Sequence, residues 1–215
     1  AYKDKYMAEF NWGYTGSENF EHGKQFGFFP AVSAGWVISE ESFVKKAMPW
    51  LDMFKIRGSY GEVGNDELDG RRFPYITLVD KDESGSYAFG EFGTNTVLGY
   101  RIKTLGTPYL TWEVAKKYDI GVDFSIFNGK FTGTVDYFVD KRDDIFMQRN
   151  QMPLTTGLAD QTPMANVGKM KSTGWDGNIA YTQQVGKVNL QFRANFTYQT
   201  TDILDKDEAA NELWY

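Results

Sequence analysis

Acidic residues and one histidine are the side chains of this sequence that could carry out acid–base chemistry. Asp143 and Asp144 are adjacent, and adjacent side chains of an extended chain point to opposite faces, so the two carboxylates cannot straddle one glycosidic bond. His22 is the only histidine and cysteine is absent, which excludes metal sites and Ser-His-Asp sites of the usual kind. We therefore predict that the two aspartates lie at the solvated entrance of a loop and that His22 lies on the surface. We also predict no enzymatic activity.

The segment DKDESGSYAFGE, residues 80–91, has the spacing of a calcium-binding loop. It fits D-x-D-x-S-G-x5-E, which would place Asp80, Asp82, Ser84 and Glu91 around a cation, with Gly85 at the turn. No convincing helical pattern flanks the segment, and the same residues suit an ordinary external loop. We therefore predict no metal or other cofactor, and a gain in thermal stability on adding calcium would reverse that prediction.

The composition restricts the class of protein. The chain has 215 residues, 17% of them aromatic, and a net charge of −6, and its mean hydropathy is −0.48. The negative charge argues against nucleic acid as a partner, because phosphate binding needs clustered lysine and arginine. No apolar run approaches the roughly 18 residues of a transmembrane helix. A membrane barrel stays possible, because its lipid-facing residues alternate with polar ones and the average hydropathy cancels.

Alternation of apolar and polar residues is clearest over residues 119–140, DIGVDFSIFNGKFTGTVDYFVD. Asn128-Gly129 suits the two central positions of a type I′ turn, which predicts a two-residue hairpin. That turn places Ile126 opposite Phe131 and brings apolar residues together on one face. The carboxylates fall on the other face, and a slip of one residue would exchange the two faces.

The same alternation predicts seven strands in all, most of roughly nine to eleven residues. They are centred on residues 6–14, 32–38, 54–61, 119–126, 131–140, 175–182 and 190–198. Val185-Gly186 is the expected turn of the last hairpin, with Tyr181 opposite Leu190. Residues 39–52 are expected to hold a short helical turn, capped by Ser39 and stopped by Pro49. The long segments 62–112 and 141–174 are expected to be connections with short strands at best.

Three features favour a membrane barrel over a soluble β-sandwich. The predicted strands exceed the five or six residues typical of globular proteins and match the roughly nine to eleven that cross a bilayer. Long connections gather at one end and short turns at the other, as in outer-membrane barrels. Aromatic residues collect near strand ends, where an interfacial girdle would place them: these are Trp12, Tyr14, Trp112, Phe127, Tyr137, Trp175 and Tyr198. We predict an all-β fold, a transmembrane antiparallel up-and-down β-barrel, in which seven strands leave open edges that need further strands.

Four segments resemble the barrel of SusC/RagA-family TonB-linked outer-membrane transporters. They are GKQFGFFPAVSAGWVISEESF (23–43), FKIRGSYGEVGND (54–66), LTWEVAKKYDIGVDFSIFNGKF (110–131) and the run from Pro153 through NVGKMKSTGWDG (166–177). The resemblance implies a barrel of about 22 strands with a plug domain inside it, in the outer membrane of a Gram-negative bacterium. It also implies energy from TonB and a SusD-like lipoprotein lid that captures oligosaccharides or, in some members, peptides. A plug, a TonB box and a C-terminal barrel strand are not recognisable, so we expect residues 1–215 to be part of the barrel wall.

The expected site residues follow from this resemblance and from the alternation. Aromatic residues of the long connection could bind substrate or a lid protein, or alternatively pack against one another within the loop: Tyr75, Tyr87, Phe89, Phe92, Tyr100 and Tyr109. Polar residues of the strands are expected to face the lumen: Asp123, Asp136, Asp176, Asn178, Gln191, Arg193 and Asn195. Two alternatives are a carbohydrate-binding β-sandwich of a secreted or surface protein and a β-rich glycoside hydrolase. Extraction without detergent would favour the sandwich, and a pair of carboxylates converging in a cleft would favour the hydrolase.

Overall fold

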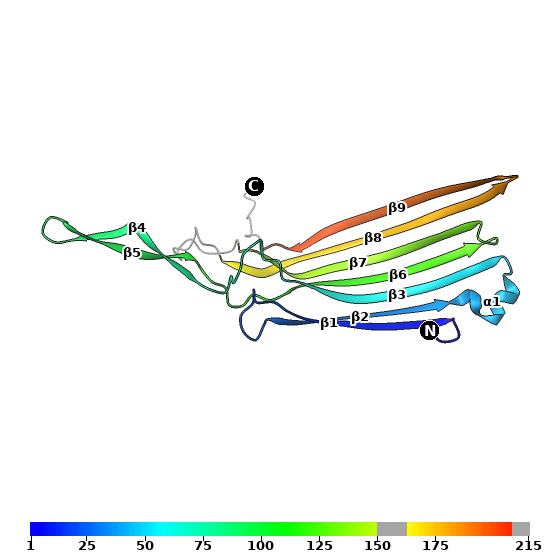
Figure 1. The fold of residues 1–215 in the computed structure, drawn as a ribbon, viewed down its shortest axis with the longest axis horizontal. Coiled ribbons are helices and arrows are strands. Elements are labelled where there is room, and N and C mark those ends of the chain that lie inside the picture. The colour runs from blue at the N-terminus through cyan, green and yellow to red at the C-terminus, as the bar shows by residue number, and fades with distance from the viewer. Residues whose placement is uncertain (150–162, 208–215) are drawn as a thin grey trace, which may run out of the picture.

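A computed structural model describes residues 1–149 and 163–207, without the side chains of residues 82–84. The fold is all-β, and the described part contains nine strands, one 3₁₀ turn and one short helix (Figure 1). The strands are β1 (Tyr6–Gly16), β2 (Phe26–Val37), β3 (Leu51–Asn65), β4 (Leu78–Phe89), β5 (Asn95–Thr104), β6 (Glu113–Ile126), β7 (Phe131–Gln148), β8 (Met164–Val185) and β9 (Val188–Asp205). In this part of the chain, no helix is long and apolar enough to cross a membrane.

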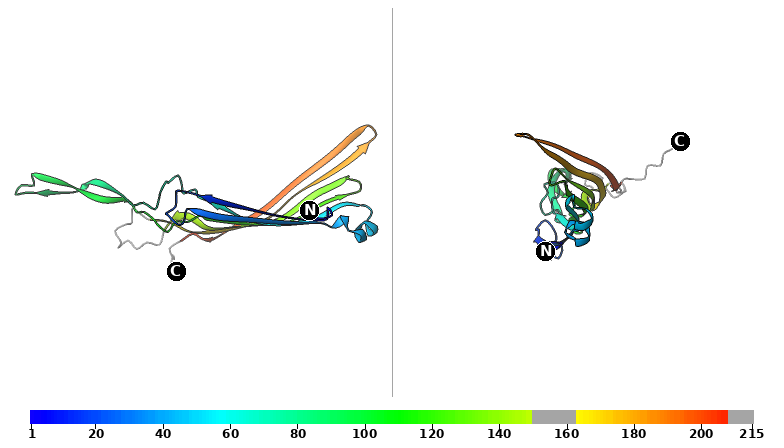
Figure 2. Two further views of the ribbon diagram at one scale, coloured as in Figure 1. Left: turned by 60° about the horizontal axis from the view of Figure 1, so that its bottom comes forward. Right: turned by 90° about the vertical axis from the view of Figure 1, so that its right-hand side faces the viewer.

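Seven strands form one antiparallel sheet in the order β1-β2-β3-β6-β7-β8-β9. Neighbours in the sequence are neighbours in the sheet, except that β4 and β5 are inserted between β3 and β6 and pair only with each other. The sheet is twisted, and its two outermost strands in the described chain are β1 and β9 (Figure 2). This up-and-down order confirms the predicted fold class, an antiparallel segment of a β-barrel.

The hairpin of β6 and β7 has the predicted register. Ile126 pairs with Phe131, and every further pair of the ladder follows from that one. Asn128 and Gly129 both adopt positive φ, at 57° and 74°, as a type I′ turn requires. Phe127 also adopts positive φ, at 58°, so the turn is a four-residue loop rather than a minimal two-residue one.

The turn of the β8–β9 hairpin is displaced by one residue from the predicted position. Val185 pairs with Val188, so Gly186 and Lys187 form the turn, and Tyr181 lies opposite Phe192 rather than Leu190. Gly186 has φ +64°, whereas a β-branched valine at positive φ is strained. Because the register moves by two residues, the two faces of the hairpin are still those that the alternation predicts.

The long connections contain much more strand than predicted. Within residues 62–112, β4 and β5 form a hairpin of 12 and 10 residues that projects beyond the sheet (Figure 1). Within residues 141–174, β7 continues to Gln148 and β8 already begins at Met164, so the NVGKMKSTG motif lies in a strand. Asp143 and Asp144 are thus strand residues rather than a loop entrance. Ladder pairing with a neighbouring strand extends elements whose own sequence lacks clear alternation.

The connection of β2 to β3 contains the expected helical turn with a different cap. It forms the 3₁₀ turn η1 (Ile38–Glu40) and the helix α1 (Ser42–Ala47), which ends before Pro49. Glu41 rather than Ser39 occupies the N-cap position, and its side chain makes no capping hydrogen bond. This connection also supports the β6–β7 turn: Trp50 O accepts a hydrogen bond of 2.9 Å from the Phe127 amide.

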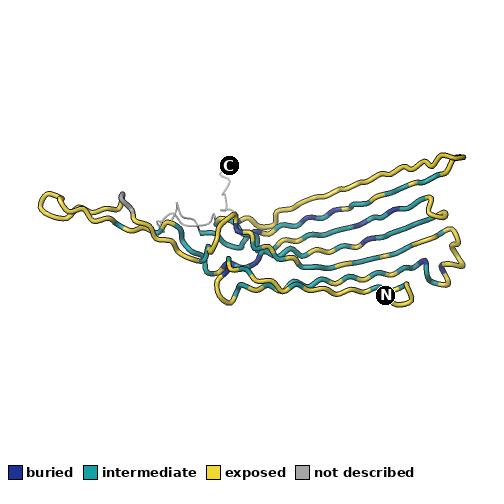
Figure 3. The backbone as a smooth tube through the Cα atoms, in the orientation of Figure 1, coloured by how far each residue is buried: buried dark blue, intermediate teal, exposed yellow. Residues whose placement is uncertain are grey.

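The hydrophobic core is a small cluster at the long-connection end of the sheet. It consists of Phe20, Leu68, Leu110 and Trp112, each at most 7% exposed. Trp112 is therefore a buried loop anchor and not the girdle residue expected from its place near a strand end. Elsewhere the apolar residues of the sheet are half-buried or exposed, as the tube coloured by burial shows (Figure 3).

Candidate functional site

Polar side chains line one face of the seven-stranded sheet. Arg57 on β3, Gly121 on β6, Asp136 on β7 and Asp176 on β8 lie directly opposite one another in successive ladders. Residues paired across a ladder share a face, so these four form one row. By the same register, all seven polar strand residues expected to face a lumen lie on this face: Asp123, Asp136, Asp176, Asn178, Gln191, Arg193 and Asn195. We name this surface the polar face.

Arg57 is the centre of a charge cluster on the polar face. Its Nη1 lies 3.1 Å from Asp119 Oδ1, its Nε 3.4 Å from Asp123 Oδ1, and its Nη2 2.5 Å from Asp136 Oδ1. Lys55 approaches Asp123 at 4.0 Å. Three carboxylates against two cations leave the cluster with a net negative charge. The importance of Arg57 was not predicted, although its position opposite the aspartate-rich hairpin was a usable signal.

Gly121 lets the Arg57 side chain extend across β6 to Asp136 on β7. Asp136 is two strands away from Arg57, with Gly121 of β6 between them. A Cβ atom built on Gly121 would lie 1.9 Å from Asp136 Oδ1 and 2.8 Å from Arg57 Cζ. The space above this glycine is therefore the path along which the guanidinium reaches Asp136. The strand needs glycine here for close approach rather than for an unusual backbone conformation.

Amide and guanidinium groups gather on β8 and β9 of the same face. Asn178 Nδ2 donates to Thr134 Oγ1 at 2.7 Å, and Gln191 Nε2 donates to Thr182 Oγ1 at 3.5 Å. Asn178, Gln191, Arg193 and Asn195 line one shallow depression of about 410 Å³. Of the predicted polar residues, Asp123 and Asp136 thus belong to the Arg57 cluster, four others line this amide-rich depression, and Asp176 is opposite Asp136 in the ladder. The depression therefore offers both hydrogen-bond donors and hydrogen-bond acceptors.

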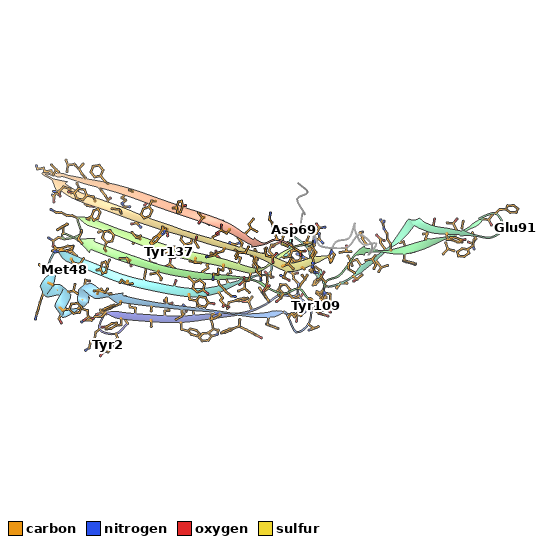
Figure 4. The ribbon with its side chains drawn as sticks, turned by 180° about the vertical axis from the view of Figure 1, so that it is seen from behind. Tyr2, Met48, Asp69, Glu91, Tyr109 and Tyr137 are labelled. Carbon is orange, nitrogen blue, oxygen red and sulfur yellow. The ribbon has the colours of Figure 1, made fainter. Side chains whose placement is uncertain are left out.

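The β4–β5 hairpin, residues 78–104, displays most of the predicted loop aromatics, and we name it the arm. Tyr87, Phe89 and Tyr100 lie in its strands, and Phe92, which is 86% exposed, lies at its tip. Tyr87 and Phe89 meet edge to face with ring centroids 4.8 Å apart. The side-chain view shows Glu91 at the tip of the arm and Tyr109 at its base (Figure 4). In the described structure these arm residues pack only within a two-stranded ribbon, which on its own is marginally stable in water.

The extended arm does not provide the calcium site considered from its sequence. Asp80 pairs with Arg101 and Phe89 with Asn95, so Asp80 and Phe89 lie six residue steps apart along β5, or roughly 20 Å. Glu91 lies beyond Phe89, so Asp80 and Glu91 cannot share an ion. Lys103 Nζ lies 3.3 Å from Asp80 Oδ2 and, by hydrogen bonding to it, lowers the pKa of the Asp80 carboxyl. No group of three potential metal-ligating side chains occurs among the described residues.

Two anchors at the base of the arm were not predicted. Asn166 on β8 donates from Nδ2 to Thr111 O at 2.9 Å and to Asp144 O at 2.8 Å, and its Oδ1 accepts from the Thr111 amide at 2.9 Å. Lys24 Nζ donates to Pro108 O at 2.9 Å and lies 5.0 Å from the ring centroid of Tyr109. Together these contacts hold the segment that returns from the arm against the sheet. The only sequence signal was the asparagine of the NVG motif.

A second unpredicted network ties the start of β1 to the turn after β2. Glu41 accepts from Lys5 Nζ at 3.0 Å and from Tyr6 OH at 2.8 Å. Trp36 Nε1 donates to the same carboxylate at 3.4 Å, and its ring stacks on Tyr6 with centroids 6.2 Å apart. The hydrogen bonds from Lys5 and Tyr6 lower the pKa of the Glu41 carboxyl from its ordinary value of 4.5. His22, by contrast, lies exposed in the β1–β2 connection, as expected.

Comparison with known proteins gives one consistent family. The family model described as "TonB dependent receptor-like, beta-barrel" matches residues 3–213. TonB-dependent receptor P26 of Formosa agariphila is 32% identical over 208 residues, which cover 97% of this chain and 19% of that protein. TonB-dependent receptor SusC of Bacteroides thetaiotaomicron is 30% identical over 177 residues, which cover 82% of this chain and 17% of that protein. This chain thus spans less than a fifth of the length of these curated relatives.

Solved structures agree with the sequence relatives. The RagAB peptide transporter matches with a TM-score of 0.74 and 25% identity over 93% of this chain and 20% of that chain. The RagAB peptide importer in its open-open state has the same fold, with a TM-score of 0.79 and 24% identity over 96% of this chain and 21% of that chain. These matches confirm the resemblance to SusC/RagA receptors. The chain belongs to the β-barrel family of TonB-dependent outer-membrane receptors.

Proposed function

We propose that this chain is part of the barrel wall of an importer in the outer membrane of a Gram-negative bacterium. Its work is binding and gated passage of a nutrient, without covalent chemistry, driven by TonB through a plug-containing region. Residues 1–215 would supply strands of the wall and the arm. Membership of the TonB-dependent receptor family supports this proposal.

The observation that carries the proposal is the difference between the two faces of the sheet. Opposite the polar face lies a surface that we name the apolar face, which includes Ile56, Val122, Val135, Ile179 and Phe192. From the pairs of Ile126 with Phe131 up to Tyr118 with Val139, no charged residue falls on it in any of the seven strands. No second sheet covers this face within residues 1–149 and 163–207, which is the arrangement that lipid contact requires and a β-sandwich does not allow.

The polar face would then line the lumen. The Arg57 cluster and the amide-rich depression offer ion-pairing and hydrogen-bonding groups to water, to a plug domain or to a passing solute. The negative cluster and the neighbouring amides would offer a passing solute hydrogen bonds at several points of the wall. That property suits a wall past which a solute must move.

The exposed aromatics of the arm would contact the substrate or a SusD-like lipoprotein lid. Tyr87, Phe92 and Tyr100 present ring faces that stack on sugars or pack against apolar protein surface. We propose an oligosaccharide or a peptide as the substrate, since the family relatives include SusC and the structural neighbours include a peptide importer. The marginal stability of an isolated ribbon favours an arm that is covered by a partner during function.

Spin labels on the apolar face test the membrane assignment. Labels at Val122, Val135 and Phe192 in the intact protein, reconstituted in lipid bilayers, are expected to be relaxed by dissolved oxygen and shielded from a water-soluble nickel chelate. Labels at Thr134 and Asn178 on the polar face serve as matched controls and are expected to show the reverse preference. Apolar-face labels that respond to neither agent would indicate burial in protein and would refute the proposal.

Uptake measurements with the arm variant Phe92→Ser test the substrate assignment. A labelled oligosaccharide mixture and a labelled peptide mixture are offered separately to cells that carry the intact protein or the variant. We expect the variant to fold and insert normally, because Phe92 makes no ring contact within the described chain, and to import the true substrate more slowly. Unchanged uptake of both mixtures would show that the tip of the arm contacts neither substrate nor lid.

A further inference from the structure

Three lysines lie side by side on the apolar face, at its border toward the long connections. Lys116 on β6 pairs with Lys141 on β7, and Lys141 pairs with Lys171 on β8. Glu62 of β3 continues the row on one side and Asp202 of β9 on the other. Paired residues share a face, so all five side chains belong to the apolar face and not to the polar one. We name Lys116, Lys141 and Lys171 the lysine row.

The lysine row marks where the apolar face ends. The preceding pairs are Tyr60 with Tyr118 and Tyr118 with Val139, and the two tyrosine rings lie 4.9 Å apart. The uncharged band from Ile126 to Tyr118 covers eight residue steps, about 26 Å of strand. At a tilt near 40° this is about 20 Å along the membrane normal, close to the ~25 Å band of an outer-membrane barrel.

The lysine row also lies at the end of the sheet from which the long connections leave. The arm and the buried Phe20 cluster are at that end, while the short turns at Asn128 and Gly186 are at the opposite one (Figure 1). In an outer-membrane barrel the long loops are external. The row therefore falls at the border between hydrocarbon and headgroups in the outer leaflet.

Among the described residues, Lys116 is the one member of the lysine row with an ion-pair partner within 4 Å. Lys116 Nζ lies 3.0 Å from Asp143 Oδ2. Lys141 Nζ lies 5.8 Å from the centroid of the Tyr118 ring. In the part of the chain that the structure describes, neither Lys141 nor Lys171 has an ion-pair partner within 4 Å, although Asp202 is opposite Lys171 in the ladder. Like charges directly opposite each other destabilise an antiparallel pair. An anion between Lys141 and Lys171 would remove that repulsion.

We propose that Lys141 and Lys171 bind a phosphate group of an outer-leaflet lipid, with Lys116 adjacent. The inference rests on the proposed membrane placement and adds a specific lipid contact to it. Residues directly opposite across a ladder have Cβ atoms about 4.5–5.5 Å apart, so both ammonium groups can reach one phosphate. Lysine side chains near a membrane border extend toward the headgroups while their methylene chains stay on apolar surface.

The position of the lysine row favours a lipid phosphate over a solute or the lid. The lysines lie on the face opposite to the Arg57 cluster, so a solute that moves along the polar face does not meet them. The apolar surface directly below them suits acyl chains, and the tyrosines between suit the interface. A lipid carries its charged phosphate on the outer side of its hydrocarbon chains, so it matches the order of lysines, tyrosines and apolar residues along the strands.

The experiment compares lipid binding by the intact protein with and without the two lysines. Lys141→Gln/Lys171→Gln is titrated in detergent micelles with bisphosphorylated lipid A or with enzymatically dephosphorylated lipid A, and bound lipid is counted by native mass spectrometry. Lys55→Gln/Lys117→Gln is the matched control, because it removes two lysines of the polar face from the same sheet. We expect affinity for the phosphorylated lipid to fall by about fivefold for each lysine removed, with no change in the control.

Other outcomes overturn the inference without touching the proposed function. Equal binding of phosphorylated and dephosphorylated lipid would show that acyl chains alone hold the lipid. Equal losses in the two double variants would show a diffuse charge effect rather than a site. The spin-label experiment on the apolar face tests the membrane placement independently. If those labels are relaxed by oxygen and lipid binding does not depend on the phosphate, the lysine site is refuted and the membrane placement stands.

Discussion

Replacing Gly121 by alanine is expected to release Arg57 from Asp136 and to destabilise the protein. The new Cβ would fall 1.9 Å from Asp136 Oδ1 and 2.8 Å from Arg57 Cζ. Both atoms are at the ends of flexible side chains, so they can move away, and the cost is the loss of the ion pair rather than a backbone clash. Gly58→Ala is the matched control, because its Cβ would meet only Asp119 O, at an ordinary contact distance of 3.7 Å.

The size of the effect follows from the exposure of the pair. Two unit charges about 4 Å apart interact by roughly 4 kcal/mol at an effective dielectric constant near 20. The Arg57 side chain is 34% exposed and Asp136 only 12%, and Arg57 retains its other carboxylates, so we reduce the loss to about 1–2 kcal/mol. Alanine gains roughly 0.5–1 kcal/mol over glycine in a strand, and this gain applies to both variants. The difference between Gly121→Ala and Gly58→Ala is therefore expected to be about 1–2 kcal/mol.

The assay is equilibrium urea unfolding of the intact protein in lipid vesicles, followed by tryptophan fluorescence. Each glycine variant is measured alone and in an Arg57→Ala background, where the ion pair no longer exists. The cost of Gly121→Ala is expected to shrink in that background, while the effect of Gly58→Ala stays the same. If Gly121→Ala is as stable as Gly58→Ala, or if its cost persists without Arg57, the reasoning about the path above this glycine is wrong.

Three further predictions test other parts of the structure. Val122→Lys places a charge in the middle of the apolar face and is expected to lower the free energy of unfolding by about 2–4 kcal/mol. The control variant Thr134→Lys, on the polar face, is expected to lower it far less. Equal losses in the two variants would contradict the assignment of faces. Asn166→Ala removes the side chain that is hydrogen-bonded to the Thr111 amide and carbonyl. Hydrogen exchange at the Thr111 amide should become faster, while exchange in the β6–β7 ladder stays the same. Unchanged exchange at Thr111 would show that this anchor is redundant. The pKa of Glu41 is lowered in the folded protein, so its stabilising contribution is fully present above the ordinary carboxyl pKa and is lost as pH falls through the folded-state pKa. The variant Glu41→Gln should therefore lose less stability than the unaltered protein when urea unfolding is measured below about pH 4.5. Identical pH profiles for the two proteins would contradict the role of this network.

The alternation and the turn residues of the chain determined the faces and the main hairpin. Period-two patterning depends only on which residues are neighbours in the sequence, and Asn128-Gly129 adopts positive φ because of its own covalent structure. The fold class, the β6–β7 register and the two faces could therefore be predicted from the amino-acid sequence alone. The observed second turn lies one residue beyond the predicted one, because alternation constrains parity and not the exact turn, and because Val185 would be strained at the positive φ that Gly186 adopts.

Contacts between distant segments were decided only by the tertiary structure. The arm became strands because β4 and β5 pair with each other, and β7 and β8 lengthened because each provides the ladder for the other. Trp112 is buried because Phe20 and Leu110, from different connections, meet around it. The reach of Arg57 over Gly121 to Asp136 exists because three strands align in one register. Pairing energies and side-chain reach act across the sheet between residues far apart in the chain, and no local pattern records which residues will meet.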